Sequence, residues 1–343
     1  MENRLRGAGW TRRDVLRTLG VSGAAVAGTS VLDGWLHRLE AQDLSKVRGK
    51  TIGYTQSFST IEWTVAQREQ VEEGCRKYGL KLVYLDAQNQ AAKQVRDIED
   101  LVTKKVDLII IATWFAEAIA PAVREVNKAG IPIVVLSSDL VGGVEYNAHI
   151  TTDSLDTGRD VGKAVVKALN GKGRVVQIEG KPGSVVNQLR GKGFREIVDK
   201  ETNIKIIAHV IANYERVQAL KAMEDILQAQ RNIDAVYCHN DDMALGVMQA
   251  FREGGRKGEA KIYGVDGIQA EALQAILDGE MTGTWLYLPL GSEGVELAVR
   301  VLSDQKVPRK LVLPSPMINR GNVQEYYDPA TRKRKVAPVK LPI

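Results

Sequence analysis

The chain has 343 residues, of which 44% are hydrophobic, 26% charged and 6% aromatic. This length exceeds what one hydrophobic core usually serves, so two domains are expected. The composition is that of a globular protein and excludes disordered and fibrous classes. The net charge of +5 comes from 47 basic and 42 acidic residues, a mixed balance that gives no support to nucleic-acid binding. The two cysteines, Cys75 and Cys238, are too far apart in sequence to indicate a disulfide framework or a metal site.

Residues 1–41 are predicted to be an export signal. Arg12 and Arg13 precede LGVSGAAVAGTSVL (residues 19–32), a stretch of small and apolar residues without a charge. This stretch is shorter than the roughly 20 residues of a membrane-spanning helix, and a basic flank is typical of a signal peptide. We therefore expect export by the twin-arginine route to the periplasm or the extracellular face, with no stable membrane insertion once the signal is removed.

An alternative interpretation of the same region remains open. Residues 14–34 also resemble the helix-turn-helix of lactose-repressor-type regulators, which would make the protein a ligand-responsive transcriptional regulator. Residues 23–29, which would enter the major groove, offer mainly Ala, Val and Gly where base recognition needs Arg, Asn or Gln. The export signal is therefore the preferred interpretation.

From Thr51 onward, short runs rich in β-branched residues alternate with longer segments of helical period. Such alternation predicts an α/β fold in which parallel sheets are covered by helices. One predicted helix ends at Tyr78, with Gly79 as its C-terminal cap. The predicted strands are 51–57, 80–85, 107–112 and 132–136 in the first half, and 174–180, 204–210, 234–238 and 261–267 in the second.

The two halves keep similar spacing between their strands, so the sequence predicts a duplicated lobe: two doubly wound parallel-sheet lobes. In open α/β sheets, ligands bind outside the carboxyl ends of the strands. Two such lobes that face each other place their strand-end loops around one cleft. The residues that follow each strand are therefore the candidates for a binding site.

Aromatic and polar residues occupy these strand ends. Trp63 and Trp114 could stack on the C–H faces of sugar rings, as could Trp285. The polar candidates are Ser137, Ser138, Arg190, Asn240 and Asp266. Planar Arg, Asn and Asp groups can each bind two neighbouring hydroxyls. Asp241 and Asp242 are predicted to begin the following helix, where carboxylates suit the helix dipole.

No catalytic motif is apparent in the sequence. There is no phosphate-binding loop, no dinucleotide fingerprint, no nucleophile elbow and no HExxH motif, and the four histidines lack metal-ligand spacing. We therefore expect a non-enzymatic protein without a cofactor or a metal.

Three segments carry a family resemblance: RGKGF (190–194), YCHNDDMALG (237–246) and YGVDG (263–267). With them the chain resembles the ribose- and galactofuranose-type periplasmic binding proteins of bacterial ABC importers, from residue 50 to about residue 328. The resemblance implies a type I fold with a three-segment hinge near Asp153, Trp285 and Leu313, and closure around the ligand. It implies ligand contacts for Arg190, Asn240 and Asp266, and an aromatic role for Trp63 and Tyr214.

The resemblance also implies a domain plan and partners. The N-terminal lobe is expected to comprise residues 50–152 and 286–312, the C-terminal lobe 153–285 and 313–328, and a basic tail 329–343. The expected partners are a small polyhydroxylated ligand, either a sugar or a polyol, and the permease of an ABC importer, with the protein acting as a monomer. A binding protein that reports to a signalling receptor is an open alternative.

The sequence departs from the family pattern in the first lobe. Ser137 and Ser138 stand where sugar binders commonly carry Asp-Arg, and Tyr287 stands where a glutamine is common. Residues 112–114, Ala-Thr-Trp, make this lobe more apolar and aromatic. We therefore expect the second lobe to bind hydroxyls and the first to stack on the ligand. This division puts ribose itself in doubt and suits another sugar, a polyol or a less hydroxylated analogue.

Overall fold

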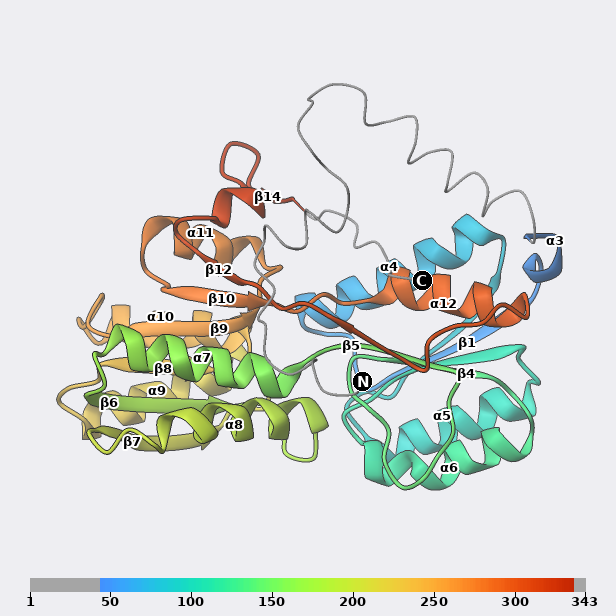
Figure 1. Ribbon diagram of the computed structural model, residues 1–343, viewed down its shortest axis with the longest axis horizontal. Coiled ribbons are helices and arrows are strands. Elements are labelled where there is room, and N and C mark those ends of the chain that lie inside the picture. The colour runs from blue at the N-terminus through green and yellow to red at the C-terminus, as the bar shows by residue number, and fades with distance from the viewer. Residues whose placement is uncertain (1–43, 336–343) are drawn as a thin grey trace, which may run out of the picture. The chain divides into compact units, whose positions relative to one another are not determined.

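The computed structural model describes residues 44–335 (Figure 1). The predicted export signal and the competing helix-turn-helix interpretation both fall on residues outside this range. None of the helices between residues 44 and 335 combines the length and apolar character that a bilayer crossing requires.

The N-terminal lobe is built on a six-stranded sheet. Its strands are β1 (Thr51–Gln56), β2 (Lys81–Asp86), β3 (Leu108–Ala112), β4 (Ile133–Leu136), β5 (Ala148–Thr152) and β11 (Lys310–Leu313). Its helices are α3 (Leu44–Val47), α4 (Glu62–Tyr78), α5 (Ala91–Thr103), α6 (Ala116–Lys128) and α12 (Gly291–Leu302). Helix α4 packs against α12, and α5 packs against α6 (Figure 1).

The C-terminal lobe is built on a second six-stranded sheet. Its strands are β6 (Gly173–Glu179), β7 (Ile204–Ile211), β8 (Ala235–Cys238), β9 (Lys261–Asp266), β10 (Gly283–Leu286) and β12 (Met317–Asn319). Its helices are α7 (Ser154–Ala168), α8 (Val185–Val198), α9 (Arg216–Ala229), α10 (Asp241–Glu253) and α11 (Ala270–Asp278), followed by the 3-10 helix η1 (Val323–Glu325). A short hairpin comes last: β13 (Tyr327–Asp328) ends the expected C-terminal lobe, and β14 (Lys333–Arg334) lies within the segment expected as a basic tail.

The two sheets share one topology. Their strand orders are β2-β1-β3-β4-β5-β11 and β7-β6-β8-β9-β10-β12, so each lobe repeats the same doubly wound pattern. They differ in the last strand, because β11 pairs with β5 in parallel whereas β12 pairs with β10 in antiparallel fashion. The predicted fold class, two doubly wound α/β lobes, is confirmed.

The chain passes between the lobes after β5, after β10 and after β11. The first passage leads through Asp153 into α7, and the second runs from Leu286 to α12, which returns to the N-terminal lobe. The third leads from Leu313 to β12. The third segment lies beside the other two, since Leu313 pairs with Thr152 and the Pro316 backbone oxygen accepts the N–H of Leu286. A bend at these segments would move one lobe as a unit against the other.

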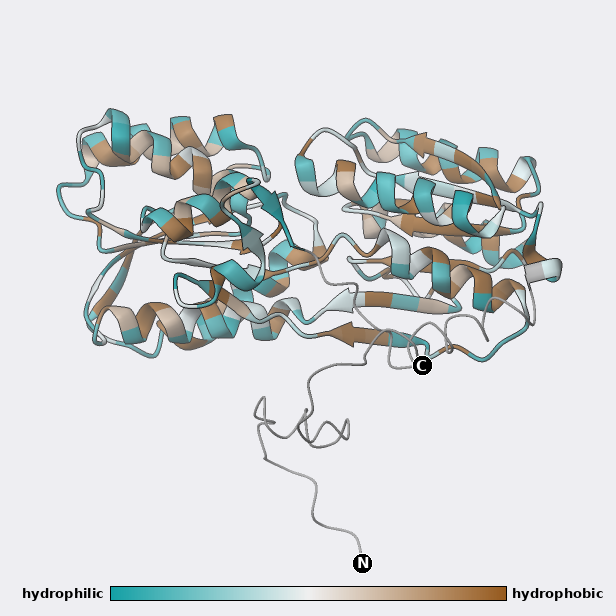
Figure 2. Cartoon of the chain, turned by 90° about the horizontal axis from the view of Figure 1, so that it is seen from above, coloured by the Kyte–Doolittle hydropathy of each residue, from teal (hydrophilic) through white to brown (hydrophobic). Residues whose placement is uncertain are grey.

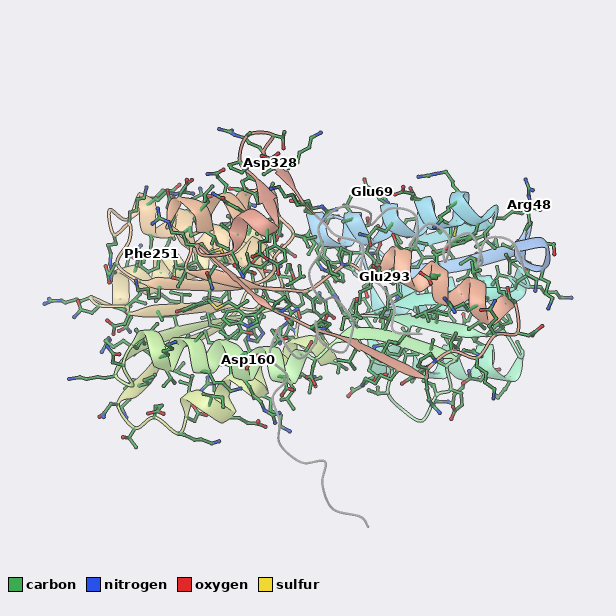
Figure 3. The ribbon with its side chains drawn as sticks, turned by 45° about the horizontal axis from the view of Figure 1, so that its top comes forward. Arg48, Glu69, Asp160, Phe251, Glu293 and Asp328 are labelled. Carbon is green, nitrogen blue, oxygen red and sulfur yellow. The ribbon has the colours of Figure 1, made fainter. Side chains whose placement is uncertain are left out.

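The central strands form because their sequences suit burial on both faces. Every residue of β3 (LIIIA) and of β4 (IVVL) is buried. Along the helices, brown hydrophobic residues alternate with teal hydrophilic ones (Figure 2). Exposed charges such as Glu69 on α4 and Asp160 on α7 lie on the outer faces of the helices (Figure 3). The sheets therefore act as rigid platforms for the loops at their strand ends.

Several helix ends carry the residues that sequence reasoning expects. Gly79 adopts a left-handed conformation, with φ of 66°, and caps α4 as predicted. The Ser184 hydroxyl caps α8 by accepting the N–H of Asn187. The prediction that Asp241 and Asp242 begin a helix is confirmed, since both lie in the first turn of α10.

Helices α7 and α8 approach each other unusually closely. A Cβ atom at Gly158 of α7 would lie 2.2 Å from the backbone oxygen of Arg190, and one at Gly193 of α8 would lie 2.1 Å from that of Leu155. Only glycine permits this approach. The close packing fixes α8, and with it the backbone of Arg190, against the rest of the lobe.

Candidate functional site

A cleft with about 550 Å³ of empty space, part of it open to solvent, lies between the lobes. The structure brings all nine predicted ligand-binding residues to its walls: Trp63, Trp114, Ser137, Ser138, Arg190, Tyr214, Asn240, Asp266 and Tyr287. These residues come from both lobes and from the second passage between them. Arg190, expected at a strand end, lies instead within α8, and Trp63 lies in the first turn of α4. Contact of the nine residues with a ligand stays a prediction.

Trp63 and Tyr287 form one aromatic wall. Their ring centroids are 5.5 Å apart and the rings are stacked, and the indole N–H of Trp63 donates a 2.7 Å hydrogen bond to the backbone oxygen of Tyr287. The guanidinium carbon of Arg190 lies 4.6 Å from the centroid of the Tyr287 ring, a cation–π distance. Residues from α4, the interlobe passage and α8 therefore make one continuous surface.

Trp114 makes a second aromatic contact, which joins the lobes across the cleft. Its ring lies 4.4 Å from that of Phe58 and 5.1 Å from that of Tyr214 in the other lobe. Tyr214 has a left-handed backbone, with φ of 67°, and its ring lies so close to Gly180 that a Cβ there would be 2.1 Å from a ring carbon. Burial raises the pKa of Tyr214 to about 12, so its hydroxyl stays protonated.

Arg190 is a buried cation with unused hydrogen-bonding capacity. It is 2% exposed, and its Nη1 donates a 2.5 Å hydrogen bond to the backbone oxygen of His239. Its Nε and Nη2 have no partner among residues 44–335. These two nitrogens form one edge of the guanidinium plane, and that edge can bind two neighbouring oxygen atoms at once.

A buried polar network supports this arginine. The His239 ring nitrogens lie 2.7 Å from Oδ1 of Asn187 and 3.1 Å from Nε2 of Gln177. Desolvation by burial holds the pKa of His239 well below its usual range, and the positive charge of Arg190 lowers this pKa further. His239 is therefore neutral at physiological pH and adds no positive charge beside Arg190.

Asp266 places a carboxyl group in the cleft at the end of β9. It is 4% exposed and has a strained backbone, with φ of 134°, in a region that non-glycine residues rarely adopt. Burial raises the pKa of Asp266 well above its usual range, although the nearby Arg190 opposes that shift. A strained, buried carboxyl group that faces a cleft is a candidate for ligand recognition.

Asp241 braces the Asp266 turn, a role that the sequence did not reveal. Its carboxylate accepts hydrogen bonds from the Gly267 N–H at 2.7 Å and from the Thr284 hydroxyl at 2.6 Å. Desolvation raises the pKa of Asp241 to about 6, against the lowering effect of these two donors. The residue links α10, β10 and the turn after β9, so it positions Asp266 without lining the cleft.

Most of the hydrogen-bonding capacity of the Asn240 amide is used within the protein. Its Oδ1 accepts the N–H of Met243 as the cap of α10, at 2.9 Å, and its Nδ2 donates to the backbone oxygen of Tyr214 at 3.2 Å. The oxygen is therefore occupied, and the predicted ligand contact is left to the second amide hydrogen.

The two serines differ in their surroundings. The Ser137 hydroxyl accepts a 3.2 Å hydrogen bond from Gln67, whereas the Ser138 hydroxyl is buried without a partner among the described residues. Ser137 has a left-handed backbone, with φ of 65°, which turns the chain sharply at the end of β4.

Sequence reasoning missed several residues of the cleft wall. They are Gln56, Ser57, Phe58, Ile61, Thr64, Gln67, Leu136 and Val186. Ser57 and Phe58 directly follow β1, so the strand-end rule could have found them, whereas nothing in the sequence points to Val186 in the first turn of α8. Trp285, also considered at a strand end, is buried within β10 and does not line the cleft.

Within residues 44–335, no group of three or more His, Cys, Asp or Glu side chains is arranged to hold a metal ion. The cleft is lined by aromatic rings, aliphatic side chains, amides, hydroxyls, one guanidinium and one carboxyl group. Such a set suits reversible binding of a neutral, polar and partly apolar small molecule.

Comparison with known proteins agrees with this architecture. Residues 52–306 match the model of the periplasmic binding protein domain. The chain is 30% identical over 266 residues to the ribose import binding protein of Bacillus subtilis, covering 77% of this chain and 85% of the relative. It is 31% identical over 272 residues to the galactofuranose-binding protein of Escherichia coli, covering 77% and 85%.

One solved structure matches this chain with similar sequence identity and coverage. The myo-inositol binding protein of Caulobacter, bound to myo-inositol, matches with a TM-score of 0.77 and 30% identity, covering 81% of this chain and 97% of that protein. The predicted resemblance to the ribose- and galactofuranose-type binding proteins is thereby confirmed, with its two-lobed type I fold. The chain belongs to the periplasmic binding protein family.

Proposed function

We propose that this protein binds a sugar or polyol in the cleft between its lobes and delivers it, chemically unchanged, to the permease of an ABC importer. The observation that carries the proposal is the buried edge of Arg190, whose Nε and Nη2 have no partner within residues 44–335 and line the same cavity as the carboxyl group of Asp266. Leaving such donors without acceptors is costly, and neighbouring hydroxyls of a carbohydrate satisfy both nitrogens at once.

The aromatic walls support the same proposal. Trp63, Trp114, Tyr214 and Tyr287 offer ring surfaces within one cavity, and such surfaces pack on the C–H faces of sugars while the hydroxyls bond elsewhere. The relatives named for ribose, galactofuranose and myo-inositol indicate the same ligand class. Bending at the three interlobe segments provides the closure that traps the ligand.

The test is a thermal-shift screen followed by calorimetry. The purified protein is heated with ribose, galactose, xylitol and myo-inositol, and with deoxy sugars. A ligand present at 100 times its dissociation constant should stabilise the protein by about 2.7 kcal/mol. After prolonged incubation the ligand should be recovered unchanged. A panel in which no sugar or polyol binds would contradict the proposal, as would a ligand-derived product.

We propose further that the precursor is exported by the twin-arginine route and acts in the periplasm or at the extracellular face as a monomer. The motive is the Arg12-Arg13 pair before its uncharged stretch. The double variant Arg12→Lys, Arg13→Lys should accumulate in the cytoplasm, which cell fractionation measures. Normal export of this variant would show that the two arginines are not required as an export signal.

A further inference from the structure

The N-terminal side of the cleft is largely apolar. Phe58, Ile61, Ala112, Trp114 and Leu136 all line it, and the Phe58 and Trp114 rings meet at 4.4 Å in an edge-on contact. A hydroxyl group placed against these side chains finds carbon atoms and ring faces in place of hydrogen-bond partners.

Most polar side chains of this wall already form hydrogen bonds within the protein. Gln56 donates to the Thr64 backbone oxygen at 2.9 Å, and Gln67 donates to the Pro289 backbone oxygen at 2.5 Å. The Thr64 hydroxyl donates to the backbone oxygen of Ile61 at 3.0 Å. These bonds hold the amides and the hydroxyl in the framework of the lobe.

Gln94 accepts hydrogen bonds from two further hydroxyls of this wall. Its Oε1 accepts the hydroxyl of Thr113 at 2.8 Å and that of Ser57 at 3.4 Å. The Ser57 oxygen also accepts the backbone N–H of Trp114 at 2.7 Å. Among the described side chains of this wall and of the adjoining passage after β10, the Ser138 and Tyr287 hydroxyls and the indole N–H of Trp114 are the polar groups left without a hydrogen bond from the protein.

The ionisable groups that line the cleft lie on the other side. Arg190 offers two donor nitrogens, Nε and Nη2, and the Asp266 carboxyl group lines the same cavity. A ligand that matches the chemistry of both sides of the cleft therefore carries its hydroxyls on the edge that faces Arg190 and Asp266. Its remaining surface lies against Phe58, Ile61 and Trp114.

We infer that the ligand is a deoxygenated sugar or polyol, one that carries a methyl or methylene group where its fully hydroxylated parent carries a further hydroxyl. This inference rests on the proposed function and narrows it. A hydroxyl buried against the apolar wall loses its water without gaining a partner, whereas a methyl group there gains from leaving water. Because an apolar pocket discriminates against an added hydroxyl only moderately, the preference should be about ten- to a hundredfold.

Matched pairs of sugars test the inference. Calorimetry is performed with L-fucose and L-galactose, D-fucose and D-galactose, L-rhamnose and L-mannose, and 2-deoxy-D-ribose and D-ribose. In the pair with the highest affinity, the deoxy member should bind about ten- to a hundredfold more tightly. A parent sugar that binds as tightly as its deoxy partner, or more tightly, would overturn the inference and leave the proposed function standing. If these eight sugars, xylitol and myo-inositol all fail to bind, the proposed function itself fails.

A variant of the wall provides the second measurement. Ile61 is partly buried, so Ile61→Gln adds an amide of similar size without opening the core, and Ile61→Val is the matched apolar control. The glutamine variant should reduce the preference for the deoxy sugar to about threefold or less, since the added hydroxyl then has a partner, while the valine variant keeps it. Melting temperatures establish that both variants fold. An unchanged preference in Ile61→Gln would show that the apolar wall does not set the selectivity.

Discussion

The two lobes repeat one topology but present opposite chemistry to the cleft. The N-terminal lobe holds its strand ends with neutral amides and hydroxyls, among them Gln56, Gln67 and Gln94, and turns ring faces to the cavity. The C-terminal lobe presents the ionisable groups Arg190 and Asp266 to the cleft, with Asp241 buried behind them. The two copies of the fold can therefore play different parts in ligand recognition. The ionisable groups of the C-terminal lobe orient the ligand, and the rings of the N-terminal lobe pack against it. This division is a hypothesis that variants of each side can test.

The largest effect is expected from the charged side. Replacing Asp266 or Arg190 by alanine would leave hydroxyls of the bound ligand desolvated and without a partner, so affinity should fall by about 2 to 5 kcal/mol, roughly thirtyfold or more. Calorimetry with the ligand found in the screen measures the loss. Lys192→Ala is the control, because Lys192 lies on the same helix but is exposed. A loss of less than tenfold in both site variants would contradict the assignment of the hydroxyl-binding role to the C-terminal lobe.

The second effect concerns pH and Asp241. Its pKa in the folded protein is about 6, above the roughly 3.9 of an unfolded chain, so the folded state holds the proton more tightly. The stabilisation is complete below about pH 4 and is lost as the pH rises through 6, a change of at most about 3 kcal/mol. Relative to Asp241→Asn, the wild type should lose unfolding free energy between pH 4 and pH 7, measured by denaturant titration. Parallel profiles for the two proteins would show that Asp241 does not titrate in this range.

The smallest effect is expected on the neutral side. Ser138→Ala removes a hydroxyl that has no partner in the described part of the chain, and should cost about 0.5 to 1.5 kcal/mol of affinity if that hydroxyl binds the ligand. Ser137→Ala should cost less, since its hydroxyl already accepts from Gln67. The same calorimetry compares them with Asp266→Ala. Serine variants that lose more affinity than Asp266→Ala would reverse the division between the lobes.

Much of the cleft wall could be predicted from the sequence. Parallel strands end at one edge of a sheet, so residues that directly follow predicted strands, such as Trp114 and Asp266, had to gather there. Ile61, Thr64 and Gln67 were missed because they lie in α4 or just before it, beyond the strand end. Their place in the wall depends on how α4 packs against the passage after β10, through contacts such as that of Gln67 with Pro289.

By itself the sequence determined the alternation of strands and helices, the duplication, the fold class and the family. These features depend on local patterns of hydrophobicity and on short motifs, which can be read along the chain. Tertiary structure alone decided which polar groups remain free. Asn240 and Ser137 look equivalent to Asp266 and Ser138 in sequence, yet the fold gives the first two protein partners and leaves the Ser138 hydroxyl without one. The physical reason is that hydrogen bonding joins residues far apart in the chain, so the donors and acceptors left for a ligand are known only once the protein's own bonds have formed.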